Sequence, residues 1–303
     1  MKSLATLCVA LIAALSFTAP LVRAEDPPKP GETPKPATKE IVRLTEWPKP
    51  ADKSQVLTDI ERVCKAHIPE MAQQGHEGLL AEGGACVPFV LERYGRERDE
   101  AVQKRLFDVL LATTGAEHTR LLAKEFGSKY LPTRTFALWR AAQFPDPELR
   151  KDADAAWTRV SKQGDKADTE ERYAAALCCA STGSIVGLPG LWDATNTPKE
   201  WDKKKNELRA ALNGARGKEA TAYVLAKLDD KADRKIKVCA LRMLAACGDK
   251  DSAARVRPFL DDEDNQIRVA AINALRGIID GDEPIENLSA FEAIELAKKW
   301  KSR

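Results

Sequence analysis

Residues 234–279 read RKIKVCALRMLAACGDKDSAARVRPFLDDEDNQIRVAAINALRGII, and a stripe of apolar side chains occurs twice within them. The first stripe comprises Ile236, Cys239, Ala240, Met243, Leu244 and Cys247; the second, 31 residues later, comprises Ile267, Ala270, Ala271, Ala274, Leu275 and Ile278. Steps of three and one place such residues on one face of a helix. Because a single helical unit cannot bury such a face alone, the recurrence predicts stacked helical pairs.

Further helical segments, separated by short polar or glycine-containing breaks, extend this pattern toward the N-terminus. The first runs from Leu57 to Met71; we expect Pro69 to kink it or end it early, and Gly75 to close it. No stretch alternates with a period of two, so strands are not expected. The later expected helices are 86–94, 101–114, 119–126, 133–143, 148–161, 169–181, 206–212, 218–228, 235–247, 252–260, 266–279 and one from Ser289, where Glu292 completes a capping box.

The N-terminus has the pattern of an export signal. Lys2 precedes an apolar run that ends before Arg23, and small residues precede Glu25, so we predict a signal peptide at residues 1–24. The alternatives are an uncleaved membrane anchor and a lipid anchor on Cys8, which lies inside the run. Residues 25–51 hold seven prolines and are expected to form a disordered, solvated linker, with the folded array at 52–303.

Charge excludes one class of partner. The full chain has 48 basic and 46 acidic residues, and removal of the leader takes away Lys2 and Arg23 but no acid. The mature chain would therefore be neutral, whereas a general nucleic-acid binder carries a basic excess. We expect no nucleic-acid partner.

Six cysteines remain after the leader, and an even number in an exported chain allows a disulfide framework. Cys239 and Cys247 lie on the apolar stripe of one helix, about 12 Å apart along its axis, so they cannot pair with each other. We expect the cysteines to serve as small, buried apolar residues; a disulfide framework is the alternative.

The sequence NQIRVAAINALRGI at residues 265–278 resembles the second helix of a HEAT repeat, particularly the short kind related to phycobilisome-lyase repeats. The resemblance is strongest over residues 206–279, extends over 84–181 and is absent before Asp52. It implies an all-α fold: a right-handed α-solenoid of six to seven HEAT-like helical hairpins (the ARM-type fold), whose second helices line a concave surface.

The resemblance also implies a ladder of charges, in which an aspartate before a second helix pairs with an arginine from one repeat to the next. A basic residue recurs at the comparable place in successive second helices, although position 237 is lysine, which cannot form a bidentate fork. We expect a structural role for these residues, and not a row of ligand-binding groups. The ladder comprises Asp99, Arg105, Arg134, Arg172, Lys237, Asp262 and Arg268, with Asp264 as a further carboxylate before Arg268.

Two groups of residues are candidates for chemistry. Cys64, His67, His76 and Cys86 are the residue types of a zinc site, but eight and nine residues separate the later members, which matches no zinc spacing known to us. The adjacent Cys178 and Cys179 would need an accessible, electropositive setting to be reactive. Nucleophile-elbow, phosphate-loop and dinucleotide motifs do not occur. We therefore expect no metal, no cofactor and no enzymatic activity.

One segment interrupts the helical rhythm. Residues 183–205, GSIVGLPGLWDATNTPKEWDKKK, hold three glycines, two prolines and two tryptophans. Long irregular loops often carry function, and tryptophan often dominates the energy of an interface. Trp192 and Trp201 are therefore candidate interaction residues; the alternative is a longer connection whose tryptophans pack on neighbouring helices.

Together these patterns predict a periplasmic or secreted scaffold that binds another protein through its concave surface, without catalysis and without membrane insertion once the signal is cleaved. HEAT-like arrays usually serve as platforms for proteins. Some short HEAT-like proteins act as lyases or hydroxylases, so a metal-dependent or lyase-like enzyme is the alternative. A third possibility is a cell-surface structural element that engages envelope polymers.

Overall fold

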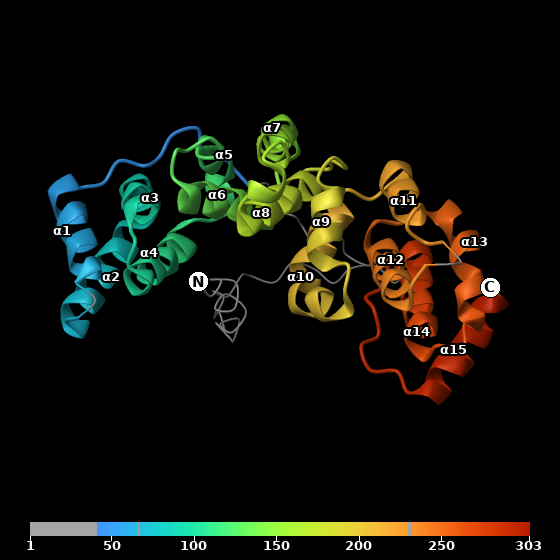
Figure 1. Ribbon diagram of the computed structural model, residues 1–303. Coiled ribbons are helices and arrows are strands. Elements are labelled where there is room, and N and C mark those ends of the chain that lie inside the picture. The colour runs from blue at the N-terminus through green and yellow to red at the C-terminus, as the bar shows by residue number, and fades with distance from the viewer. Residues whose placement is uncertain (1–40, 66, 230–231) are drawn as a thin grey trace, which may run out of the picture. The chain divides into compact units, whose positions relative to one another are not determined.

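The computed structural model describes residues 41–65, 67–229 and 232–303. Within these ranges the chain is all α, with no strand (Figure 1). The predicted signal peptide with Cys8, and residues 25–40 of the predicted linker, lie outside the described residues.

The described helices form seven consecutive hairpins and a final helix, which confirms the predicted all-α stack of helical pairs. Second helices pack on one another from α6 to α8, α10, α12 and α14, and α14 packs on α15. The hairpins are α1 (Lys53–Cys64) with α2 (Pro69–Glu82), α3 (Val87–Arg96) with α4 (Glu100–Thr113), α5 (Thr119–Ala123) with α6 (Leu131–Gln143), α7 (Arg150–Ser161) with α8 (Thr169–Ser181), α9 (Leu188–Thr195) with α10 (Pro198–Gly214), α11 (Lys218–Leu225) with α12 (Arg234–Cys247), and α13 (Ala253–Val256) with α14 (Asn265–Leu275), followed by α15 (Ala290–Lys301).

The apolar stripes of residues 234–279 are buried as expected, apart from Ile236, which is half-buried. On α12 all positions from 238 to 247 are buried except Arg242, and the α14 stripe is buried over its length. The two helices approach closely where Gly277 meets Ala245: a Cβ at Gly277 would lie 2.0 Å from the Ala245 carbonyl oxygen. Only glycine allows this approach.

The first hairpin differs from its prediction at Pro69 and Gly75. Helix α1 ends at Cys64, and Pro69 occupies the first position of α2, where its missing N–H needs no partner. Gly75 lies inside α2 and does not end it. A Cβ there would lie 2.4 Å from the Asp59 carbonyl oxygen, so Gly75 lets α2 pack directly on α1.

The aspartates before the second helices cap those helices. The side chain of Asp99 accepts hydrogen bonds from the amides of Ala101 and Val102, at 2.9 and 3.0 Å. Asp264 accepts from Gln266 and Ile267 in the same way. The other two such caps are Asp168 on α8 and Asp233 on α12. Each cap satisfies amides that the helix leaves free and contributes about 1 kcal/mol.

The main ion pair between repeats is centred on Glu171, which the predicted ladder does not contain. Arg134 of α6 holds its carboxylate with two hydrogen bonds, at 2.6 and 3.1 Å, and Arg159 of α7 adds a contact at 2.8 Å. The Glu171 side chain is 2% exposed. Burial alone would raise its pKa, but the two guanidinium groups outweigh burial and hold the pKa below its usual range.

The other members of the predicted ladder have individual partners. Arg172 pairs with Asp193 of α9 at 2.8 Å, and the Lys237 ammonium lies 5.8 Å from the centroid of the Phe259 ring. Arg105 lies half-buried on α4. Arg268 donates to the backbone carbonyl of Asp262 at 2.8 Å, while the Asp262 carboxylate accepts from the Asp264 amide. Asp264 itself pairs with Arg234 of the preceding repeat.

The folded unit begins at Arg43, earlier than the predicted start near Asp52. Arg43 donates to the carbonyls of Ala116 and Pro145 at 2.8 and 2.9 Å. Its Nε lies 3.0 Å from the buried carboxylate of Asp146, which Arg120 also holds at 2.7 Å. These interactions fix the chain on the third hairpin.

Residues Arg43–Trp47, the N-terminal strap, also contact the turn before α5. The Leu44 amide donates to the Glu117 carbonyl at 2.8 Å. The Trp47 ring stacks on His118, with centroids 5.3 Å apart. His118 is buried, and its Nδ1 accepts a hydrogen bond from the Gly115 amide at 3.0 Å. Burial lowers the pKa of His118; the nearby Arg140 charge lowers it further, and Glu117 opposes this shift.

Replacing Glu171 with Gln should leave Arg134 and Arg159 without a charged partner and destabilise the middle hairpins by about 3 kcal/mol. Hydrogen exchange across urea concentrations measures this locally, which suits an array that does not unfold as one unit. Glu148→Gln, which removes an exposed pair with Arg120, is the control and should change stability by less than about 0.5 kcal/mol. Wild-type protection of α6–α8 in Glu171→Gln would show that the buried pair contributes nothing.

Acid should loosen the N-terminal strap. Because the folded-state pKa of His118 is lowered, its stabilising contribution is complete above the unfolded pKa of about 6.5 and is lost as pH falls through the folded value. Protonated Nδ1 also loses the hydrogen bond from Gly115. Exchange of strap amides, corrected for intrinsic rates, should therefore accelerate between about pH 7 and about pH 5 relative to α12. His118→Asn keeps an acceptor without a titratable group and should abolish the response; an unchanged response would exclude His118 as its cause.

Candidate functional site

Three consecutive second helices bring aromatic and charged side chains together on one face. Trp139 of α6 donates its Nε1–H to Glu207 of α10 at 3.2 Å. The Tyr173 hydroxyl of α8 donates to the other oxygen of Glu207 at 2.8 Å. The Lys204 ammonium lies 3.8 Å from the centroid of the Tyr173 ring. With Glu170, these residues form what we call the α6–α10 cluster.

The cluster combines a fixed hydrogen-bond network with accessible charge. Trp139, Glu170, Lys204 and Glu207 are half-buried, so each still presents part of its side chain to solvent. Burial raises the pKa of Glu170; Lys204 opposes this, and Glu207 adds to it. Burial and the charge of Glu207 raise the pKa of the Tyr173 phenol. The cluster therefore offers two carboxyl groups, one ammonium and an indole edge to an incoming polar surface.

A second aromatic group supports the cluster from the N-terminal side. Phe107 of α4 lies 5.7 Å from Trp139, and Phe136 packs edge-on against Phe107 at 5.6 Å, measured between ring centroids. Such pairs stabilise by about 1 kcal/mol beyond the area they bury. The indole that faces Glu207 is thus held on a packed aromatic base.

The interpretation of Trp192 and Trp201 as interaction residues is wrong. Residues 183–205 are largely helical, and the indoles are 8% and 2% exposed, on α9 and α10. Gly190 allows α9 to meet Trp157 and α8, since a Cβ there would lie 2.5 Å from the Trp157 ring. The tryptophans therefore pack against neighbouring helices, as the alternative reading of the segment proposed.

The residues considered for zinc are engaged separately. Arg93 donates to the Cys64 sulfur at 3.2 Å, and Cys86 is buried, with its thiol 3.4 Å from the Leu79 carbonyl oxygen. His67 is exposed and His76 is half-buried on α2. Among the described residues no three His, Cys, Asp or Glu side chains are grouped so as to hold a metal ion.

All six cysteines of the described chain are free thiols. Cys178 and Cys179 are fully buried on α8, and burial raises the pKa of Cys178 to about 12. Burial also raises the pKa of Cys247 to about 12. Neutral, buried thiols of this kind are poor nucleophiles.

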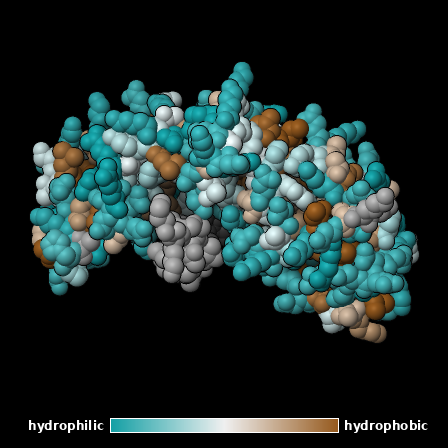
Figure 2. Space-filling model, in the orientation of Figure 1, coloured by the Kyte–Doolittle hydropathy of each residue, from teal (hydrophilic) through white to brown (hydrophobic). Residues whose placement is uncertain are grey.

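The visible face of the molecule is mostly hydrophilic, with apolar residues in small separate groups (Figure 2). In the described part of the chain, none of the helices combines the length and apolar character needed to cross a bilayer. A partner that binds this face would meet chiefly polar side chains.

Sequence reasoning did not find the cluster. An interval of 34 residues separates Trp139 from Tyr173, and the same interval separates Tyr173 from Glu207. This spacing brings equivalent positions of successive second helices onto one face. That spacing is the available signal, and it exceeds the 31-residue interval of the C-terminal stripes.

Comparison with protein-family models identifies HEAT repeats at residues 221–292, from α11 to the start of α15. Comparisons with curated proteins and with solved structures find no match. The matched segment contains the two apolar stripes and the hairpins α11–α12 and α13–α14, which stack as consecutive repeats. Residues 221–292 are therefore HEAT repeats.

Proposed function

We propose that the chain is an exported scaffold that binds another protein through the concave surface of its second helices, with no catalysis of its own. HEAT repeats commonly present such surfaces to protein partners. The observation that carries the proposal is the α6–α10 cluster, where Trp139, Tyr173 and Glu207 form one network from three repeats.

The cluster has the properties of an interface centre. The half-buried indole of Trp139 is a rigid aromatic contact, and tryptophan is enriched among residues that dominate binding energy. Glu207 holds both rings in place, so little side-chain freedom is lost on binding. Lys204 and Glu170 add charge that selects a complementary partner.

Export rests on the signal pattern of residues 1–24. Residues 25–42 would then separate the cleavage site from the folded array, which begins at Arg43. Periplasmic or secreted locations both agree with this proposal, and the partner would be a protein of the same compartment.

Lys204→Glu should weaken partner binding at least about tenfold, because it reverses the charge beside Tyr173 without truncating the core. The full chain with a C-terminal tag would be cross-linked in its host envelope, the partner identified, and affinity measured with purified components. Lys151→Glu, an equal charge change at an exposed position on the first helix α7, should leave affinity within about twofold. Equal affinities of wild type and Lys204→Glu would remove the cluster from the interface.

Ala24→Phe should block signal cleavage, because the peptidase site accepts only small residues at this position. The wild-type chain should be recovered outside the cytoplasm with Glu25 as its first residue, and the variant as an uncleaved precursor. Intact mass and N-terminal sequencing of fractionated cells measure both. Full-length wild type in the cytoplasm would refute export, while full-length protein in the membrane would favour the anchor.

A further inference from the structure

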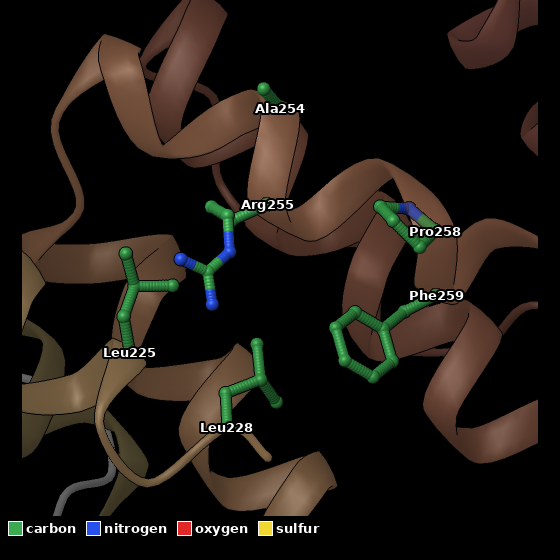
Figure 3. Close-up of a pocket in the computed structure, with 6 residues that line it drawn as sticks. All are labelled: Leu225, Leu228, Ala254, Arg255, Pro258 and Phe259. Carbon is green, nitrogen blue, oxygen red and sulfur yellow. The ribbon is translucent and has the colours of Figure 1, made fainter. Parts of the chain in front are cut away.

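A hollow of about 270 Å³ opens between the first helices α11 and α13. Its lining residues come from the end of α11 and the segment that follows it, and from α13 with the following turn η7 (Arg257–Asp261) (Figure 3). Pro258 has no N–H to donate, and from Arg257 onward the chain continues as the 3₁₀ turn η7. The lining residues are Leu225, Leu228, Ala254, Arg255, Pro258 and Phe259.

Apart from Arg255, the residues that line the hollow have apolar side chains. Leu228 and Phe259 are buried side chains that form part of its wall. The guanidinium of Arg255 points into the space beside Leu225 and Leu228 (Figure 3). Arg255 is exposed. Its side chain makes no ion pair or hydrogen bond with any of the described residues.

The neighbouring arginines differ from Arg255 in this respect. Arg257 donates to the Trp300 carbonyl at 3.0 Å, and Arg216 donates to the carbonyls of Ala246 and Gly277 at 3.1 and 3.2 Å. Lys237, whose ammonium lies 5.8 Å from the Phe259 ring centroid, adds positive charge near the same wall. The hollow thus combines apolar lining side chains with two cations, Arg255 and the nearby Lys237, that could bind an anion.

The volume limits the kind of ligand. Sites for drug-sized molecules and cofactors occupy about 300–1,000 Å³, so a hollow of about 270 Å³ suits one or two side chains. An apolar side chain gains by leaving water for the Leu228–Phe259 wall. A carboxylate beside it gains two parallel hydrogen bonds from a guanidinium with free N–H groups.

We propose that this hollow docks a peptide segment of a partner protein in which a bulky apolar residue adjoins a carboxylate. The apolar side chain enters between Leu228 and Phe259, and Arg255 binds the carboxylate. This inference rests on the proposed function, in that the partner is a protein. It adds a second contact on the first helices, separate from the α6–α10 cluster.

The test uses the full folded chain and three fluorescein-labelled peptides in a Gly-Ser frame, containing Asp-Phe-Leu, Asn-Phe-Leu or Asp-Ala-Ala. Fluorescence anisotropy at low salt measures affinity. The Asp-Phe-Leu peptide should bind in the range of about 0.1–1 mM, and each of the other two should bind at least about fivefold more weakly. No binding of Asp-Phe-Leu at about 1 mM, or equal binding of all three, would overturn the proposal.

Two variants locate the site without truncating the core. Arg255→Glu reverses the charge, and Ala254→Trp fills the hollow from an exposed position; both should lower affinity for Asp-Phe-Leu at least about tenfold, while Arg255→Lys should retain part of it. Arg98→Glu, an equal charge change at an exposed residue far along the chain, is the control and should bind as wild type. Wild-type affinity in both hollow variants would place the peptide elsewhere.

A second copy of the chain is the competing occupant, since α15 exposes Phe291 to 73% beside Glu292. Sedimentation with increasing protein concentration separates the two. Self-association abolished equally by Phe291→Asp and Arg255→Glu would overturn docking of a partner peptide. The Lys204→Glu experiment on the second helices is independent, so the proposed function and this inference can fail separately.

Discussion

Helix α8 is enclosed on almost all sides, and the packing of the central hairpins depends on it. It contacts α6, α7, α9 and α10, and residues 173–181 are all buried. Small side chains make this possible: a Cβ at Gly187 would lie 2.8 Å from the Ala176 carbonyl oxygen, so α9 begins almost in contact with the α8 backbone. Interiors packed at this density transmit a change at one helix to its neighbours.

An enclosed helix must satisfy its polar groups without help from water. Asp168 caps the first amides of α8, and Glu171 is held by guanidinium groups from α6 and α7. The same end of the helix carries Tyr173, so the anchor that fixes the register of α6 and α8 also fixes the phenol beside Glu207. The rigidity of the α6–α10 cluster is a by-product of how the repeats are held together.

Periodicity explains which parts of this structure can be predicted from sequence. The stripes from Ile236 and Ile267 predict the second helices because burial on one face repeats with the helical turn. Glu171 is not predictable in this way, since a glutamate in a charged first turn is usually solvated, and only Arg134 and Arg159 make its burial favourable. The N-terminal strap has no local signal either: Arg43 meets Asp146 about 100 residues later, a contact that no pattern within one segment encodes. The prolines and glycines around Trp192 and Trp201 are typical of a loop. In the structure the prolines begin helices α9 and α10, and the glycines allow close packing.

The buried thiols can report local opening of the array. Cys86 lies in an early hairpin, Cys178 and Cys179 in the middle, and Cys239 and Cys247 near the end, all free and shielded from solvent. A thiol reagent or an oxidant reaches such a sulfur only while its surroundings are open. In a stack whose repeats contact only their neighbours, openings at different places are separate events. The rate at which each cysteine is modified is therefore a measure of local stability. The thiol that is modified fastest lies in the least stable part of the stack.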